Sequence, residues 1–390
     1  MINRKTLDAV GDPGALFDAL IARSDLRKFA DSALRSRFVA TMAGLSYGIF
    51  GNHRQAAVQQ IESVLNTRLA LARDLDAYPE IASEPIERPV FVVGYARTGT
   101  TVMHSLLGED PASRIPLAWH GWRPSPPPGR FPESVPQRIL EADTEVSAYI
   151  RKVPDILKPH PYWDRLGHAP IEDEELFALN FQHPYPTRYF DIPARPDSFD
   201  VPDPVQAFRF HRQLLQHLQW RSPRKRWVCK GVMHQFCLDA LWSVYPDAIC
   251  IWTHRDPLET VPSTLGILDI LYGSITGNRT TPAIAQAMVN GLAAGFEAVL
   301  DMPSVHDPRV VHVRFRDLVS NPIEVMNTLY QKQNMAWTPD YETRIAAWRT
   351  KPENISNRHG EFKYSLERFG LDRAELQDRF ARYRERFSVA

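Results

Sequence analysis

The fold of this chain is decided by residues 90–101, which read VFVVGYARTGTT. A run of β-forming residues enters a loop bounded by Gly94 and Gly99, and the helix-compatible run at residues 102–107 follows. A strand, a glycine loop and a helix N-terminus together make an anion site, because the amides and the helix dipole point at the ligand. The glycine spacing is that of a P-loop, but Thr100 replaces the lysine of nucleotide hydrolases and the cation is Arg97. The stretch therefore predicts a site for a phosphate-like group that differs from an ordinary ATPase site.

Composition limits the class of protein. The 390 residues allow one large α/β domain with additions or two domains, and acidic and basic residues balance at 46 each. No global positive field therefore points to nucleic acid. No apolar stretch approaches the ~20 residues of a membrane span, and the polar N-terminus does not read as a signal peptide. The three cysteines show no metal-ligand spacing and read as reduced core residues, so we expect a cytoplasmic protein.

Residues 1–85 are expected to form a helical cap that belongs to the same globule. Apolar residues recur there every three to four positions, until Pro79 and Pro85 interrupt the pattern. Residues 86–390 are expected to form the functional domain. Three later apolar runs, at residues 226–229, 248–253 and 309–313, read as strands buried on both faces of a parallel sheet. Helical patterns separate them, which predicts an α/β fold with a P-loop-like parallel sheet flanked by helices and ligands at the strand carboxyl ends.

A long insertion, at about residues 109–205, separates the first strand, loop and helix from these later strands. It is rich in proline and aromatic residues, so regular strands or helices cannot make up most of it. It is also too long for an idle loop in a compact domain. We expect short helices and ordered loops that wall a pocket over the active site; the alternative is a rigid surface cover without a ligand role.

A second anion motif follows the strand at residues 248–253. Arg255 stands at the carboxyl end of that strand, and Ser263 lies eight residues later, two turns into the expected helix. Arginine supplies a forked, permanently charged donor and serine a compact one. A nucleotide with phosphates at two places would use both loops.

The combination resembles the sulfotransferases that use 3′-phosphoadenosine-5′-phosphosulfate (PAPS). In that family a P-R-S/T-G-T-T loop binds the 5′-phosphosulfate, and a later arginine and serine bind the 3′-phosphate; residues 97–101 and the Arg255–Ser263 pair match these motifs. Arginine in the first loop makes the bacterial and Golgi-related branch the closest match. Residues 227–234, WVCKGVMH, are similar to the family's W-x-L-K-x-P-x-H, with Val232 in place of the proline. The resemblance covers about residue 85 to the C-terminus.

The resemblance implies a set of roles. Arg97 would neutralise the phosphosulfate, and Lys230 would reach the sulfuryl or bridging oxygen. Family enzymes need no metal, and we expect none here. The residues that the resemblance places at the nucleotide are Arg97, Thr98, Gly99, Thr100 and Thr101 at the 5′ end, and Arg255, Ser263, Arg358 and Gly360 at the 3′-phosphate.

Two histidines are candidates for the base that removes the acceptor proton, since a neutral imidazole serves well near neutral pH. His120 stands where this branch commonly has glutamate, beside Trp119 and Trp122. His234 lies four residues after Lys230, where cytosolic sulfotransferases place a histidine base, although it could equally orient the loop. The sequence favours His120.

The acceptor remains open between a phenol, a sugar, a lipid alcohol and a peptide tyrosine, with a small-molecule hydroxyl favoured; the oligomeric state is open as well. Two other functions would require different residues. A P-loop kinase would need a lysine in place of Thr100 and an acidic Mg²⁺ ligand at a strand end, but the strand ends carry Lys230 and Arg255. A nucleotide-binding protein without catalysis would keep the phosphate sites and lose Lys230 and the base.

Overall fold

The computed structural model describes residues 12–23, 32–47, 54–182, 203–277 and 279–390. A five-stranded sheet of order β2-β3-β1-β4-β5 lies at its centre, and every pairing is parallel. Its strands are β1 Val90–Val93, β2 Ser113–Arg114, β3 Arg226–Lys230, β4 Ile249–His254 and β5 Val310–Arg314. The strands predicted at 226–229, 248–253 and 309–313 are confirmed with bounds that differ by one residue. The edge strand β2, which lies inside the predicted insertion, was not predicted.

Successive side chains of the central strands serve two separate hydrophobic clusters. Phe91 and Cys229 belong to the larger cluster, whereas Val90, Val92 and Val228 belong to the smaller one. Because side chains alternate across a strand, these clusters lie on opposite faces of the sheet. The sheet is therefore buried on both faces, as the apolar runs of the sequence predict.

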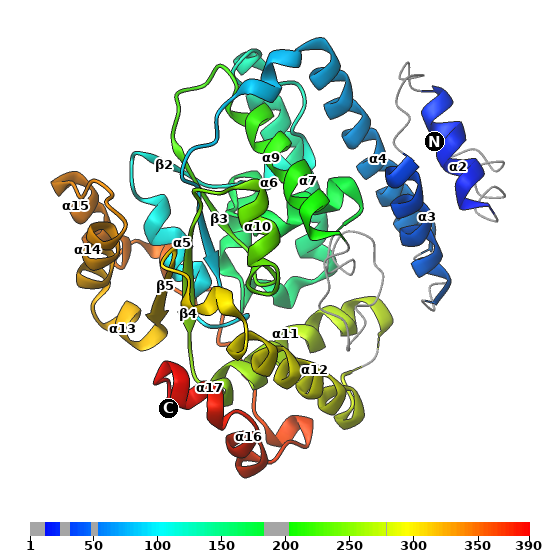
Figure 1. Cartoon of the computed structure of the whole chain (residues 1–390). Coiled ribbons are helices and arrows are strands. Elements are labelled where there is room, and N and C mark those ends of the chain that lie inside the picture. Colours follow the sequence, from blue (N-terminus) through cyan, green and yellow to red (C-terminus); the bar gives the residue numbers. More distant parts are fainter. Residues whose placement is uncertain (1–11, 24–31, 48–53, 183–202, 278) are drawn as a thin grey trace.

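Helices flank the sheet and carry most of the chain (Figure 1). In Figure 1 the pair α14 and α15 lies at the opposite side of the molecule from α2 and α3. The helices after β1 are α5 Thr100–Gly108, α6 Ala118–Trp122, α7 Val135–Lys152, α9 Pro204–Gln219, α10 Leu238–Val244, α11 Pro257–Thr276, α12 Pro282–Leu300, α13 Phe315–Ser320, α14 Pro322–Lys332, α15 Pro339–Trp348, α16 Arg373–Arg379 and α17 Ala381–Phe387.

The N-terminal region contains α2 Pro13–Arg23, α3 Ser32–Tyr47 and α4 Arg54–Ala77. Phe38 of α3 and Leu65 of α4 are fully buried and belong to the same hydrophobic cluster as Phe91 of the central strand. The described N-terminal helices thus share a core with the sheet.

The insertion predicted at about residues 109–205 is described as far as residue 182, and residues 183–202 lie outside the described residues. Besides short elements it contains α7, an 18-residue helix that is longer than the sequence predicted. Its described part also contains four 3₁₀ segments, η3 Pro132–Ser134, η4 Pro154–Leu157, η5 Pro161–His168 and η6 Asp173–Asn180.

One helix contradicts the expectation that no stretch is apolar enough to span a membrane. By length and composition α12 passes that test, although core helices of globular proteins pass it too. Met288, Leu292 and Phe296 of α12 are buried in the larger hydrophobic cluster. We therefore treat α12 as a core helix of this globule.

Candidate active site

The loop after β1 leads directly into α5 and leaves the first amides of that helix open. Gly99 is the N-cap and has a φ of 98°, a conformation that L side chains rarely adopt. A Cβ at Gly99 would also lie 2.5 Å from the ring of Phe315. The first helical bond runs from the Met103 amide to the Gly99 carbonyl at 3.0 Å. The amides before Met103 consequently have no acceptor within the helix and can bind an anion.

Thr98 has a different place from the threonines that follow it. Its hydroxyl donates to the Tyr95 carbonyl at 2.7 Å and lies 2.8 Å from the hydroxyl of Thr253 in β4. Its amide also bonds to the Tyr95 carbonyl, at 3.3 Å. Thr98 thus fixes the loop to the sheet, while Thr100 and Thr101 line the adjoining cavity.

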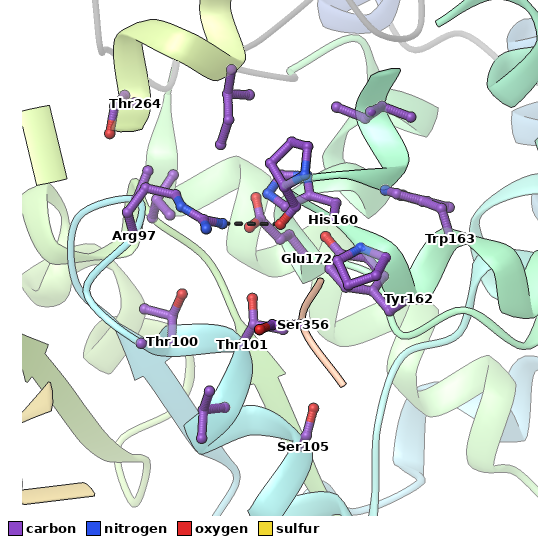
Figure 2. A pocket seen from close by; sticks show the side chains of 18 of the residues that line it. Arg97, Thr100, Thr101, Ser105, His160, Tyr162, Trp163, Glu172, Thr264 and Ser356 are labelled. Carbon is purple, nitrogen blue, oxygen red and sulfur yellow. Dashed lines mark hydrogen bonds between the residues drawn. The ribbon is translucent and has the colours of Figure 1, made fainter. Parts of the chain in front are cut away.

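That cavity has a volume of about 490 Å³ and opens where β1 and β4 end (Figure 2). In Figure 2 Arg97 extends toward Glu172 and His160, above Thr100 and Thr101. The insertion supplies much of the wall, as predicted, and α11 and α12 supply an apolar wall. Lining residues from the insertion include Tyr149, Ile156, His160, Tyr162, Trp163, Arg165, Glu172 and Glu175; those from α11 and α12 are Thr264, Ile267, Leu268, Leu271, Tyr272, Met288 and Leu292.

Arg97 connects three segments around the cavity. Its Nε donates to Ser263 Oγ in α11 at 3.1 Å, and Nη1 donates to the Pro159 carbonyl of the insertion at 3.1 Å. Burial lowers the pKa of Arg97, but a guanidinium remains charged throughout the physiological range. A permanent cation therefore faces the space above the helix N-terminus.

Lys230 and Glu172 form a salt bridge beside Thr101. The lysine Nζ lies 2.9 Å from Glu172 Oε1 and 3.4 Å from Thr101 Oγ1. The Lys230 side chain is 2% exposed and that of Glu172 is 23% exposed. Burial lowers the pKa of Lys230, but the Glu172 carboxylate and Tyr162 together raise it by more than burial lowers it. The pKa of Lys230 is therefore above its ordinary value, and the lysine is a cation.

Arg255 lines the cavity and Ser263 does not. The Arg255 guanidinium lies 4.4 Å from the Phe315 ring centre, donates to Glu259 at 2.6 Å and donates to the Arg97 carbonyl at 3.3 Å. Ser263 is fully buried, and its hydroxyl accepts the bond from Arg97 Nε. Both residues therefore contact Arg97, rather than meeting at a common point in the cavity.

The late loop that contains Arg358 packs against η5. Arg358 forms a two-fold salt bridge with Asp164, with both nitrogen–oxygen distances at 2.8 Å, and it also donates to the Pro161 carbonyl at 2.7 Å. His359 lies 2.7 Å from the same carboxylate. Arg358 lines the cavity, whereas Gly360, with a φ of 97°, is an exposed turn residue outside the lining.

The structure brings neither histidine base candidate into the cavity lining. His120 is buried, and its Nδ1 accepts a bond from the Leu117 amide at 3.0 Å, so it caps its own short helix α6. Burial and then Arg114 lower its pKa well below the ordinary value. His234 is fully buried, and its Nε2 lies 2.8 Å from Asp173 Oδ2. The choice between these two histidines as the base stays a prediction, and neither ring is among the groups that line the cavity.

Glu172 is the group that sequence reasoning missed. It opens a run of four acidic residues, Glu172 to Glu175, that follows Pro170-Ile171. Three of them are almost completely buried, although such residues are rarely buried unless they are paired. Four consecutive acidic residues between apolar residues therefore indicate that the acidic side chains have partners inside the protein. An analysis of hydrophobic periodicity does not detect this pattern.

Comparisons with known proteins agree with this geometry. A model described as "Sulfotransferase family" matches residues 89–339, more than half of the chain. The chain is 26% identical over 344 residues to omega-hydroxy-beta-dihydromenaquinone-9 sulfotransferase Stf3 of Mycobacterium bovis and of Mycobacterium tuberculosis, covering 80% of this chain and 82% of each relative.

Solved structures show the same fold. The sulfotransferase STF9 from Mycobacterium avium has a TM-score of 0.81 at 24% identity, covering 100% of this chain and 98% of its own. STF1 from Mycobacterium tuberculosis H37Rv has a TM-score of 0.73 at 22% identity, covering 97% of this chain and 100% of its own.

Proposed function

This chain belongs to the sulfotransferase family, and we propose that its sulfuryl donor is PAPS and its acceptor an apolar molecule that carries a hydroxyl group. That it is a transferase of sulfuryl groups follows from the family. The observation that carries the finer proposal is that Arg97 and Glu172 line one cavity at the N-terminus of α5, while Lys230 bonds to two residues of that lining, Glu172 and Thr101.

The donor fits the cations around the cavity. The open amides of α5 and the hydroxyls of Thr100 and Thr101 suit the 5′-phosphate, with Arg97 above them. Of the other arginines that line the cavity, Arg165, Arg255 and Arg358, we assign Arg255 and Arg358 to the 3′-phosphate. For Ser263 we propose an indirect role, because its hydroxyl holds Arg97 in place. We propose that Thr98 likewise has an indirect role, because its hydroxyl holds the loop against the sheet.

The reacting groups are then Lys230 and Glu172. The acceptor oxygen forms a bond to sulfur while the bond from sulfur to the bridging oxygen of the donor breaks, and that electron pair stays on the 5′-phosphate. Lys230 is the cation that stabilises the departing oxygen. Glu172 takes the proton of the acceptor hydroxyl, and it replaces His120 and His234 as the proposed base because it lies in the cavity 2.9 Å from Lys230.

The acceptor class follows from the wall opposite the loop. Ile267, Leu268 and Leu271 of α11, with Met288 and Leu292 of α12, offer no hydrogen bonds from their side chains. A sugar would leave hydroxyl groups unpaired against this wall, which costs free energy. A lipid alcohol or an alkylated phenol would bury its body there and present one hydroxyl to Glu172. The curated relative Stf3 is named for an omega-hydroxy menaquinone, which has this character.

Two measurements test the proposal. In a thermal-shift assay, 3′-phosphoadenosine-5′-phosphate should stabilise the protein more than ATP or ATP with Mg²⁺ does. The kinase alternative predicts the reverse order. Transfer from labelled PAPS should then be compared for a long-chain primary alcohol, an alkylphenol and a monosaccharide at equal concentration. Preference for the monosaccharide would contradict the proposed acceptor class and leave the donor assignment standing.

A further inference from the structure

Successive acidic side chains of residues 172–174 hold both ends of the turn that follows β3. Glu172 bonds to Lys230 at the start of the turn, and Asp173 bonds to His234 at its end. Between these two, Glu174 Oε1 accepts a hydrogen bond from the Met233 amide. Glu172 of the first pair lines the cavity, while both side chains of the second pair are completely buried.

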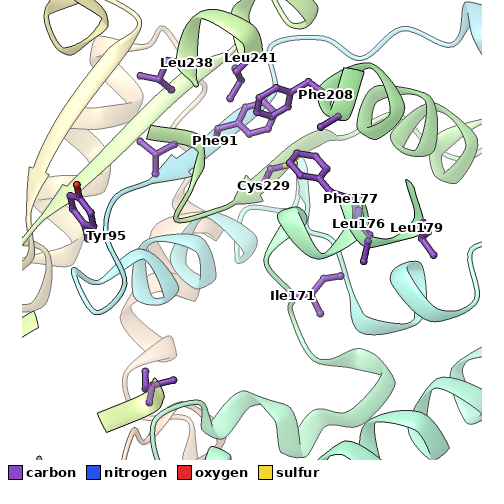
Figure 3. Close-up of a cluster of buried hydrophobic side chains, with 14 of the residues drawn as sticks. Phe91, Tyr95, Ile171, Leu176, Phe177, Leu179, Phe208, Cys229, Leu238 and Leu241 are labelled. Carbon is purple, nitrogen blue, oxygen red and sulfur yellow. The ribbon is translucent and has the colours of Figure 1, made fainter. Parts of the chain in front are cut away.

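His234 has the surroundings of a charged imidazole. Its Nε2 lies 2.8 Å from Asp173 Oδ2, and both side chains are completely buried. The rings of Phe91, Phe208 and Phe177, drawn in Figure 3, have centres 5.5, 5.2 and 6.0 Å from the imidazole. These rings surround the pair with apolar groups, so Asp173 Oδ2 is the hydrogen-bond partner of the imidazole.

Other ionisable groups pack against the same pair. His211 Nε2 lies 3.3 Å from Asp173 Oδ2, and Glu174 Oε1 lies 3.9 Å from His234 Nδ1. Burial opposes charge on His234, but the Asp173 carboxylate outweighs it and raises the pKa of His234 well above its ordinary value. Burial likewise opposes charge on Asp173, but His234 outweighs it and lowers the pKa of Asp173. Burial lowers the pKa of His211 to about 4, so the charged pair is Asp173 with His234.

We propose that Asp173 and His234 are positioning residues whose buried ion pair fixes Lys230 and Glu172 in their relative geometry, an inference that rests on the proposed function. Asp173 is the residue next to Glu172, and His234 ends the turn that Lys230 begins. Both acidic and imidazole groups pack directly against the turn, because a Cβ at Gly231 would lie 2.5 Å from His234 Nε2 and from Glu174 Oε1. A buried pair that loses one partner leaves an uncompensated charge, so the turn must move to relieve it.

The test compares Asp173→Asn with Tyr245→Phe. Tyr245 bonds to His211 Nδ1 at 2.8 Å in the same core, so its loss removes a buried hydrogen bond without removing either charge of the pair. For Asp173→Asn we expect kcat to fall by about 10²-fold, the size expected when reacting groups are misplaced by about 1 Å, with the affinity for 3′-phosphoadenosine-5′-phosphate kept. Tyr245→Phe should keep kcat while lowering the denaturant midpoint.

Three further readouts make the inference independent of a stability effect. The double variant Asp173→Asn with His234→Gln, which removes both charges and allows a neutral hydrogen bond, should recover part of the lost kcat. Nitrogen NMR should show a His234 imidazolium at pH 8 in the wild type and a neutral ring in Asp173→Asn. Hydrogen exchange should rise at residues 230–234 in Asp173→Asn and stay unchanged there in Tyr245→Phe.

Several results would overturn the inference. One is an unchanged kcat in folded Asp173→Asn; another is an equal loss of kcat in Tyr245→Phe. A stoichiometric metal in the purified protein would be a third, because ligand atoms of Asp173, His211 and Cys229 lie within 4.8 Å of one another. If the wild type transfers no sulfuryl group from PAPS, the proposed function fails, while NMR and hydrogen exchange still decide whether the pair is charged and holds the turn.

Discussion

Replacing Glu172 with glutamine should separate binding from chemistry. The amide keeps the size of the side chain but cannot accept the acceptor proton, so kcat should fall by about 10²- to 10⁴-fold, the usual contribution of a general base. This corresponds to roughly 2.7–5.4 kcal/mol of lost transition-state stabilisation. The same change releases Lys230 from its 2.9 Å salt bridge, so the affinity for 3′-phosphoadenosine-5′-phosphate should be kept or should rise.

The assay is steady-state transfer from labelled PAPS to the best acceptor, with nucleotide affinity measured by calorimetry. His120→Gln is the matched comparison, because His120 was the candidate favoured by sequence and its side chain caps α6 outside the cavity lining. Its rate should stay near that of the wild type, with a small loss of stability from the weakened cap. A rate kept in Glu172→Gln and lost in His120→Gln would refute the reasoning from geometry.

Three other outcomes are expected. Arg255→Ala should weaken binding of the 3′-phosphorylated nucleotide by about 1.5–3 kcal/mol and barely affect its 3′-dephosphorylated analogue, since a charge-assisted bond is lost only where its phosphate exists; equal losses in calorimetry would contradict this. Lys230→Met should lower kcat more than it weakens nucleotide binding, and a near-normal kcat would remove this lysine from the chemistry. Burial raises the pKa of Glu174 to about 8, so this side chain keeps its proton to higher pH in the folded state than in the unfolded state. The stability that Glu174 contributes is therefore full below the unfolded pKa of about 4.5 and is lost as pH rises through about 8. The denaturation midpoint of Glu174→Gln, measured against pH, should lack this loss.

The central strands of the sheet could be predicted because each of them has a recognisable pattern within a few consecutive residues. Runs such as residues 248–253 are apolar throughout, and only a strand buried on both faces reads this way over so short a length. The edge strand β2 has two residues, Ser113 and Arg114, and neither its length nor its composition predicts a strand. It forms only because β3 lies beside it, which is a tertiary effect.

The sequence places residues well where their position depends on the backbone and less well where it depends on side-chain direction. Arg97 and Arg255 follow strands, so the topology alone brings them to the cavity lining, and Lys230 at the end of β3 bonds to Glu172 and Thr101 of that lining. His120 was favoured because it stands where this branch of the family commonly has glutamate, beside two tryptophans, but its Nδ1 accepts a bond from the backbone amide of Leu117. Glu172 comes from a 3₁₀-rich segment without a periodic pattern, and its partner Lys230 is 58 positions away.

Three cations at or next to the cavity already have anionic partners within the chain. Asp164 holds Arg358, Glu259 holds Arg255, and Glu172 holds Lys230. A ligand that enters must exchange these partners, and a small inorganic anion can replace one of them at a time without gaining the others. A nucleotide with charge at both ends replaces several at once. We therefore expect the internal acids to disfavour binding of sulfate or phosphate alone relative to binding of the nucleotide.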